Sequence, residues 1–318
     1  RLVGSEMCIR DRDGIVLLQA ECKILLLFGL GMLLKKLQLT NAEADQFLSD
    51  LLMNVLMPMN IFVSFYQSMS LEELSTCGWL VPAGALVMAV VMLCARLIPA
   101  SVPLARRRIT EYCMLISNGS MVGIPLVESM YGPTGVFYAN MFMVSTRILS
   151  NISGQYYFDT SSHGNGVKQG LKNFVRNPLN ISMALGFLLN LLKVPVAVPV
   201  MGMCSSLAAC MSPMAMILVG STLLDTFRTV SLSQIFSGQV FGVSLFRLLA
   251  SPYITLAACR LLGVQGVQCA AAVLINAAPV VNTATIYCQK YHGDMGFTNA
   301  CVFVSAMLSF VTFWLIRF

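Results

Sequence analysis

Two short segments place helix-breaking residues and neutral hydrogen-bonding side chains inside apolar stretches of the chain. They are 117–125 (SNGSMVGIP) and 276–282 (NAAPVVN). Proline removes a backbone donor and clashes with the preceding helical turn, so each segment predicts an interrupted helix. Lipid offers no replacement partner for freed backbone groups, and such a break must therefore face protein or a watery cavity. Half-helix N-termini carry unpaired N–H groups and partial positive charge, which suits them to binding a carboxylate.

Three asparagines lie in these segments and are candidate neutral donors to a ligand: Asn118, Asn276 and Asn282. The alternative for each is a hydrogen bond between neighbouring helices, which is common for asparagine inside membranes. Both interpretations stay open at this point.

Glycine and proline in the same segments have two interpretations as well. Gly119 and Gly123 have the small-xxx-small spacing that lets two helices pack closely. Pro125 and Pro279 could simply kink their helices. Because two such breaks recur at matching places in the chain, we favour a functional crossing of two broken helices that binds substrate.

Two arginines, Arg147 and Arg247, fall near the middle of apolar stretches. A buried cation at that depth is costly and is a functional candidate by default, here as an attractor for an anion. The alternatives are pairing with a helix carbonyl, pairing with a membrane acid such as Glu21 or Glu128, or reaching outward to the interface.

The composition identifies the class of protein in which these breaks occur. Of 318 residues, 57% are hydrophobic and 11% are charged, whereas about a quarter are charged in an average soluble domain. The chain is therefore predicted to be an all-α polytopic membrane protein with ten helices of membrane-spanning length. The expected spans are 14–35, 46–66, 77–99, 109–130, 134–157, 177–193, 200–224, 236–262, 267–290 and 295–316.

Several function classes are excluded or disfavoured. The net charge of +6 comes from cations between the apolar stretches, which leaves no soluble basic face for nucleic acid. Eleven cysteines lie mostly inside apolar spans and only two histidines are present, so no metal site or cofactor is predicted. The chain has no phosphate-binding G-x-x-x-x-G-K-[ST] motif. We predict neither an enzyme nor an ATPase.

The N-terminal segment 1–12 (RLVGSEMCIRDR) has no initiator methionine and resembles translated adapter sequence, so we exclude it from fold reasoning. Membrane orientation follows from Lys and Arg near the span ends. Eleven of these cations fall on one side and three, Lys193, Arg260 and Arg317, on the other. The excess marks the cytoplasmic side and predicts that both termini lie outside.

The chain repeats itself at a nearly constant offset. Gly31 recurs as Gly186 and Pro58 as Pro213, both 155 positions later, and Pro125 is answered by Pro279. We predict two five-helix repeats, 13–157 and 177–318, joined by a cytoplasmic linker at 158–176. An odd number of spans in each repeat gives the two copies opposite orientations in the membrane, which is typical of transporters.

These motifs give the chain a family resemblance. The segment 118–126 (NGSMVGIPL) followed by Tyr131-Gly, the spans with Pro58 and Pro213, and Ala-Ala-Pro279 together resemble the auxin efflux carrier family. The likeness is strongest to its bacterial members of the malonate and malate permease kind, and covers about residues 14–316.

The resemblance implies a ten-helix inverted-repeat fold. Spans one, two, six and seven would form a scaffold, and the other six would form a transport domain. Pro125 and Pro279 would mark the crossing where organic anions bind, and a homodimer would work by an elevator-like shift.

The function expected from residues and resemblance together is secondary transport of small organic anions, such as dicarboxylates or auxin-like acids, across the bacterial plasma membrane. The alternative is a sodium-coupled symporter of the bile-acid type. Most acids sit at span ends, and the coupling ion therefore stays open.

Overall fold

The computed structural model describes residues 19, 22–67, 77–99, 102–158, 172, 174–291 and 293–316. The predicted adapter segment 1–12 and most of the predicted linker lie outside the described residues. Within these ranges the elements are helices, and the strand-like feature is one isolated antiparallel bridge between Ser117 and Val280. The all-α prediction is confirmed for this part of the chain.

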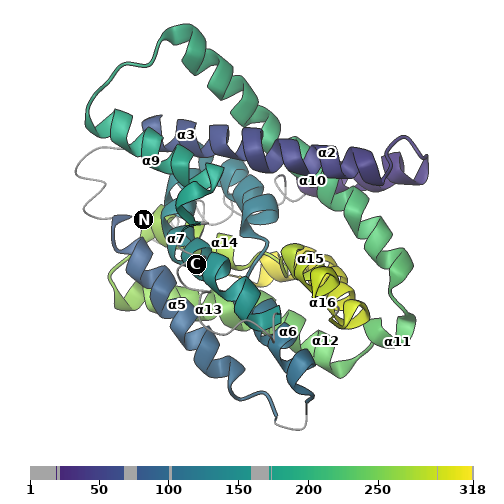
Figure 1. The fold of residues 1–318 in the computed structure, drawn as a ribbon. Coiled ribbons are helices and arrows are strands. Elements are labelled where there is room, and N and C mark those ends of the chain that lie inside the picture. The colour runs from purple at the N-terminus through teal and green to yellow at the C-terminus, as the bar shows by residue number, and fades with distance from the viewer. Residues whose placement is uncertain are drawn as a thin grey trace, which may run out of the picture.

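In the first half, a helix over 22–36 precedes seven further elements (Figure 1). They are α2 (Ala42–Leu51), the π-helical turn η1 (Leu52–Leu56), α3 (Met57–Gln67), α5 (Leu80–Ala95), α6 (Leu104–Leu115), the π-helical turn η2 (Gly119–Gly123) and α7 (Ile124–Phe158). Asn41 caps α2 by accepting a hydrogen bond from the N–H of Ala44.

The second half contains α9 (Pro178–Leu191), α10 (Val198–Thr229), α11 (Leu232–Ile235), α12 (Gly238–Leu245), the π-helical turn η3 (Phe246–Ala250), α13 (Ser251–Leu261), α14 (Gly266–Asn276), α15 (Thr283–Lys290), α16 (Met295–Thr312) and the short 3-10 helix η4 (Phe313–Leu315). Asn177 caps α9, and Pro178 occupies the first turn, where its missing N–H costs nothing. Asp294 caps α16 by accepting a hydrogen bond from the N–H of Phe297.

Four continuous helical stretches of the described chain are long and apolar enough to cross a membrane. They are Ala42–Gln67, Val198–Arg228, Gly238–Leu261 and Met295–Thr312. The apolar helices α5, α9 and α14 are shorter. Large apolar side chains also remain exposed along α9 and the start of α10, where Val198 is 85% exposed. These features support the prediction of a helical membrane protein.

One helix boundary depends on a glycine. The stretch assigned to α7 is interrupted at Gly132, whose φ of 61° and ψ of −157° are not helical. A side chain is rarely tolerated at such a φ, and Pro133 cannot donate a backbone hydrogen bond to the preceding turn. The sequence signal for a turn between the fourth and fifth spans therefore coincides with a real interruption.

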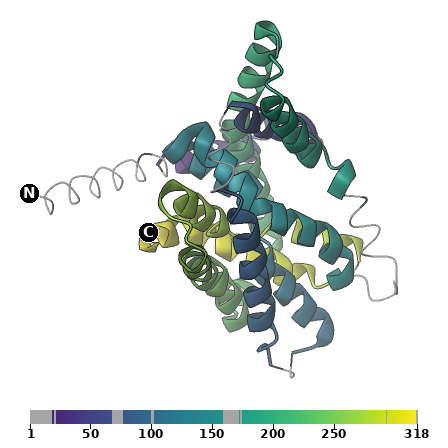
Figure 2. The same ribbon diagram turned by 90° about the vertical axis from the view of Figure 1, so that its left-hand side faces the viewer.

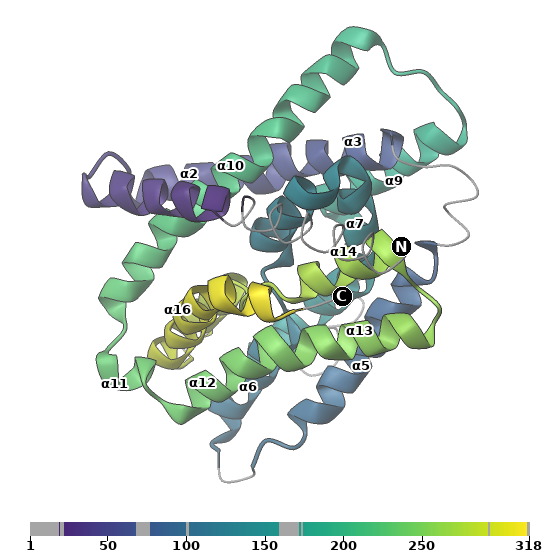
Figure 3. The same cartoon turned by 180° about the vertical axis from the view of Figure 1, so that it is seen from behind.

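The helix over 22–36, α2–α3, α9 and α10 pack together through close crossings. Figures 1 and 3 show α10 running diagonally across α2 and α3, and Figure 2 shows α9 and the first part of α10 standing out from the remaining helices. A Cβ added at Gly31 would overlap the backbone of Ile217 in α10, and one added at Gly186 would lie 2.8 Å from the carbonyl oxygen of Phe62 in α3. Both crossings therefore need glycine.

Gly31→Ala is expected to destabilise the protein because the new methyl group must push two helix backbones apart. Overpacking of this kind typically costs about 1–3 kcal/mol. The measurement is the thermal unfolding midpoint of the detergent-solubilised protein. Gly29→Ala on the same helix is the matched control, because nothing lies within 4 Å of its added Cβ. Equal midpoints for the two variants would contradict the crossing.

Candidate functional site

The two broken helices meet at their interruptions. The first leaves helical geometry after Leu115 and resumes at Gly119, and the second ends at Asn276 and resumes at Thr283. The backbone N–H of Asn118 donates to the carbonyl of Pro279 at 2.8 Å. The Ser117–Val280 bridge lies beside this bond. Each break thus satisfies part of the other's backbone in a region where lipid could not.

The first break is shorter than the sequence predicts. It covers only 116–118, and Pro125 lies beyond it in a buried part of α7. The preceding turn η2 is π-helical, and the N–H of Ile124 bonds to the carbonyl of Gly119. This wider turn accommodates a proline that would otherwise clash with an α-helical carbonyl. Pro279, by contrast, lies within the second break itself.

Arg247, in η3, binds the ends of both incoming half-helices. Its Nη1 donates to the carbonyl of Met114 at 3.2 Å, and its Nη2 donates to the carbonyl of Asn276 at 2.7 Å. Its Nε lies 3.4 Å from the carbonyl of Ala278. The side chain is fully buried. Helix C-termini have unpaired carbonyls and partial negative charge, so one guanidinium neutralises both ends at once.

Asn276 belongs to this same cluster. Its Oδ1 accepts from Arg247 Nη2 at 2.6 Å, and its Nδ2 donates to Ser251 Oγ at 2.9 Å and to Thr255 Oγ1 at 2.6 Å. Every polar atom of the amide is therefore used within the protein. The structure shows the contacts that the alternative interpretations describe: Arg247 pairs with helix carbonyls, and Asn276 bonds to side chains of η3 and α13.

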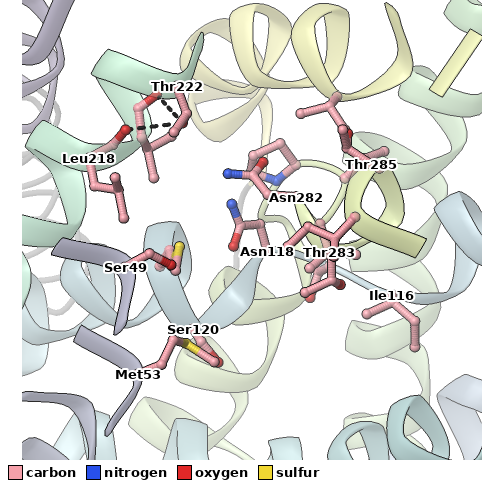
Figure 4. A pocket seen from close by; sticks show the side chains of 18 of the residues that line it. Ser49, Met53, Ile116, Asn118, Ser120, Leu218, Thr222, Asn282, Thr283 and Thr285 are labelled. Carbon is pink, nitrogen blue, oxygen red and sulfur yellow. Dashed lines mark hydrogen bonds between the residues drawn. The ribbon is translucent and has the colours of Figure 1, made fainter. Parts of the chain in front are cut away.

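A cavity of about 560 Å³ opens on the other side of the crossing. Its lining includes Asn118, Pro279, Asn282 and Arg147, four of the residues that the sequence singles out. Figure 4 shows the amides of Asn118 and Asn282 next to one another, although they come from different broken helices. The hydroxyl residues that share this lining include Ser49, Ser120, Thr222, Thr283 and Thr285.

The remaining predicted residues are not part of the cavity lining that the described chain provides. Gly119 and Gly123 face Ile275 of α14, with an added Cβ at 3.1 Å and 2.9 Å from its side chain. They therefore allow close packing, as small-xxx-small spacing suggests. Pro125, Asn276 and Arg247 are buried elsewhere at the crossing. The structure thus divides the predicted set into a cavity group and a supporting group.

The crossing gives the cavity a defined electrostatic character. The incoming half-helices α6 and α14 turn their carbonyl ends to Arg247, whereas the outgoing helices begin at Gly119 and Thr283 beside the cavity. Their first N–H groups have no partner within the helix and carry partial positive charge. Arg147 adds a full positive charge to the same lining and is 8% exposed. The arrangement is suited to an anion.

Arg147 is oriented by its own segment of α7. Its Nη2 donates to Asn140 Oδ1 at 2.6 Å, and Asn140 Nδ2 donates in turn to the carbonyl of Val136 at 2.8 Å. The buried amide therefore fixes one edge of the guanidinium while the side chain borders the cavity. This chain of hydrogen bonds positions a cation without neutralising its charge.

Comparison with known proteins identifies the family. The sequence model described as membrane transport protein matches residues 16–170 and, a second time, residues 166–317. The chain belongs to this family, the auxin efflux carrier family that its motifs resemble. An uncharacterized transporter of Methanothermobacter thermautotrophicus is 27% identical over 301 residues, which cover 91% of this chain and 93% of the relative.

The transporter also has an ionic cluster at the cavity that the sequence did not reveal. Lys35 lies 2.5 Å from Asp45 and 2.7 Å from Asp225, and the hydroxyl of Ser221 donates to both carboxylate oxygens of Asp45. Both aspartates line the cavity. In the sequence Lys35 is one of the cations counted near the span ends, and only the packing of three separate helices shows that it pairs with both acids. Asp225 also has Arg228 Nη1 at 4.0 Å.

The transporter is expected to depend on Arg247 for folding of the crossing. Arg247→Gln removes a charged donor from two helix ends, and hydrogen bonds to charged groups contribute about 1.5–3 kcal/mol each. We expect a clear fall in the thermal unfolding midpoint of the purified protein. Arg260→Gln, an exposed arginine in the last turn of α13, serves as the control. An unchanged midpoint for Arg247→Gln would show that the contacts of Arg247 with the two helix ends are not needed for stability.

Proposed function

We propose that this transporter is a secondary carrier of small organic anions, which bind at the crossing of its two broken helices. One observation carries the proposal: the N-terminal ends of both outgoing half-helices, the amides of Asn118 and Asn282 and the cation of Arg147 share one cavity. A carboxylate placed there receives donors from both halves of the chain. Dicarboxylates and auxin-like acids fit this chemistry.

The packing supports two inverted repeats of five spans each. Gly31 packs against Ile217, and Gly186 packs against Phe62. Gly186 lies 155 positions after Gly31, and Ile217 lies 155 positions after Phe62. The first span of each half therefore crosses the second span of the other half at the same point. Such an exchange is expected when two copies are related by an axis in the membrane plane.

The mechanism we propose is alternating access. The helix over 22–36, α2–α3, α9 and α10 would form the scaffold, and the elements that carry the crossing would form the transport domain. Sliding of the transport domain along the scaffold, in an elevator-like shift, would expose the cavity to each side in turn. The proposal includes a homodimer in the bacterial plasma membrane with both termini outside.

Uptake of labelled malonate, malate and an indole acid into proteoliposomes tests the function. Asn118→Ala is expected to reduce saturable uptake about tenfold, because a donor to a bound charged group is worth about 1.5–3 kcal/mol. Asn54→Ala is the matched control, since the exposed Asn54 amide bonds to the carbonyl of Asp50 away from the cavity lining. Uptake of none of these acids by folded wild-type protein would overturn the substrate class.

Arg147→Gln is expected to weaken substrate binding more than it slows turnover, since the long-range attraction of the cavity for an anion is lost. We expect KM for a dicarboxylate to rise about tenfold or more. A KM that is equal to that of the wild type would remove Arg147 from the binding site. Uptake driven by a sodium gradient alone would favour the sodium-coupled alternative.

A further inference from the structure

We propose that Glu128 is the proton-binding site that couples anion transport to a proton gradient. This inference rests on the proposed function and adds a driving ion to it. Glu128 lies in the first part of α7, the half-helix that leaves the crossing, and is half-buried. Its partners lie on α3 and α10, the two long helices that cross each other.

Two neutral side chains hold the carboxylate. Asn60 Nδ2 donates to Glu128 Oε1 at 3.1 Å, and the hydroxyl of Ser212 donates to Glu128 Oε2. Asn60 Nδ2 also lies 3.5 Å from the carbonyl of Ala208, which joins α3 to α10 at this point. The carboxylate therefore sits where the proposed transport domain touches both scaffold helices.

The partners can satisfy either protonation state of the carboxyl group. An amide and a hydroxyl each offer both a donor and an acceptor, whereas Lys or Arg would offer donors only and favour the charged form. Asn60 is 5% exposed, and its Oδ1 is a buried oxygen with no hydrogen-bond partner among the described residues. Rotation of this amide would present Oδ1 as an acceptor to a protonated Glu128.

The two helices that hold the partners of Glu128, α3 and α10, have no charged residue close to it in sequence position along the helix. Neither α3 nor α9 contains Asp, Glu, Lys or Arg, and the charges of α10 are Asp225 and Arg228. Asp225 follows Ser212 by 13 positions, which is about 20 Å along a helix. The other titratable groups on α3, α10 and this part of α7 are Tyr66, Tyr131, Cys204 and Cys210. None of the ion pairs found in the described chain includes Glu128.

Protonation of Glu128 decides whether the loaded domain can move. Glu128 and Arg147 both lie on α7 and would move together. With an anion bound and Glu128 ionised, the moving part would carry an uncompensated negative charge through a dry interface, which is costly. A proton taken up with the anion removes this charge, and both leave on the other side. The emptied domain returns with Glu128 ionised and its charge offset by Arg147, so each cycle carries one proton with one anion.

The experiment compares two modes of transport in proteoliposomes at zero membrane potential. In the first, an acidic outside drives net malonate or malate uptake. With one proton per anion, a gradient of about one pH unit supports about tenfold accumulation. In the second, labelled anion exchanges with unlabelled anion at equal pH on both sides, which needs no net proton movement.

Glu128→Gln keeps the shape of the side chain and its acceptor oxygen but cannot release a proton. We expect this variant to retain exchange within about twofold of the wild type and to lose accumulation driven by the pH gradient. Glu111→Gln is the matched control, since Glu111 accepts from Arg107 Nε at 3.1 Å and lies on the incoming half-helix α6. This control is expected to accumulate anion as the wild type does.

The two proposals fail in different ways. Absence of exchange by folded wild-type protein would refute the proposed function itself. Wild-type exchange together with gradient-driven accumulation by Glu128→Gln would refute only the coupling role. The coupling role would also be refuted if an inserted, thermally stable Glu128→Gln lost exchange. It would be refuted as well if sodium, and not protons, drove uptake by the wild type. A pH dye inside the vesicles should report one proton entering with each anion in the wild type and in Glu111→Gln, but not in Glu128→Gln.

Discussion

The need to satisfy backbone polar groups at membrane depth governs the centre of this protein. Two helices are interrupted, and each interruption frees carbonyls and N–H groups that lipid cannot satisfy. The bond from Asn118 to Pro279 and the guanidinium of Arg247 resolve most of this cost. Residues at the start of both outgoing helices, such as Ser120 and Thr283, line the cavity, so the positive ends of these helices lie beside it.

The crossing therefore separates two kinds of charge. Arg247 neutralises the negative ends of α6 and α14 inside a buried cluster that also includes Asn276. The positive ends of the outgoing helices, with Arg147, lie in a space large enough for a small molecule. Polar groups beside such a space cost little to leave without a protein partner when the cavity contains water.

The helices outside the crossing are held together by close packing at glycines. Glycines at the contacts of the helix over 22–36 with α10 and of α9 with α3 bring backbones close together and hold these four segments as a unit. Between this unit and α7, the polar contacts of Glu128 with Asn60 and Ser212 join the two parts of the molecule. Polar contacts at an apolar interface respond to protonation, whereas packed glycines do not.

The sequence by itself determined the class, the helical content and the approximate places of the breaks, because apolar length and proline position act locally. It also identified Asn118, Asn282, Pro279 and Arg147, which share one cavity. It could not separate these residues from Asn276 and Arg247. The sequence shows that a residue lies inside an apolar stretch, but not which other side chains it faces. Only the packing of distant helices decided that the first break ends before Pro125, that Arg247 binds carbonyls, and that Glu128 contacts α3 and α10.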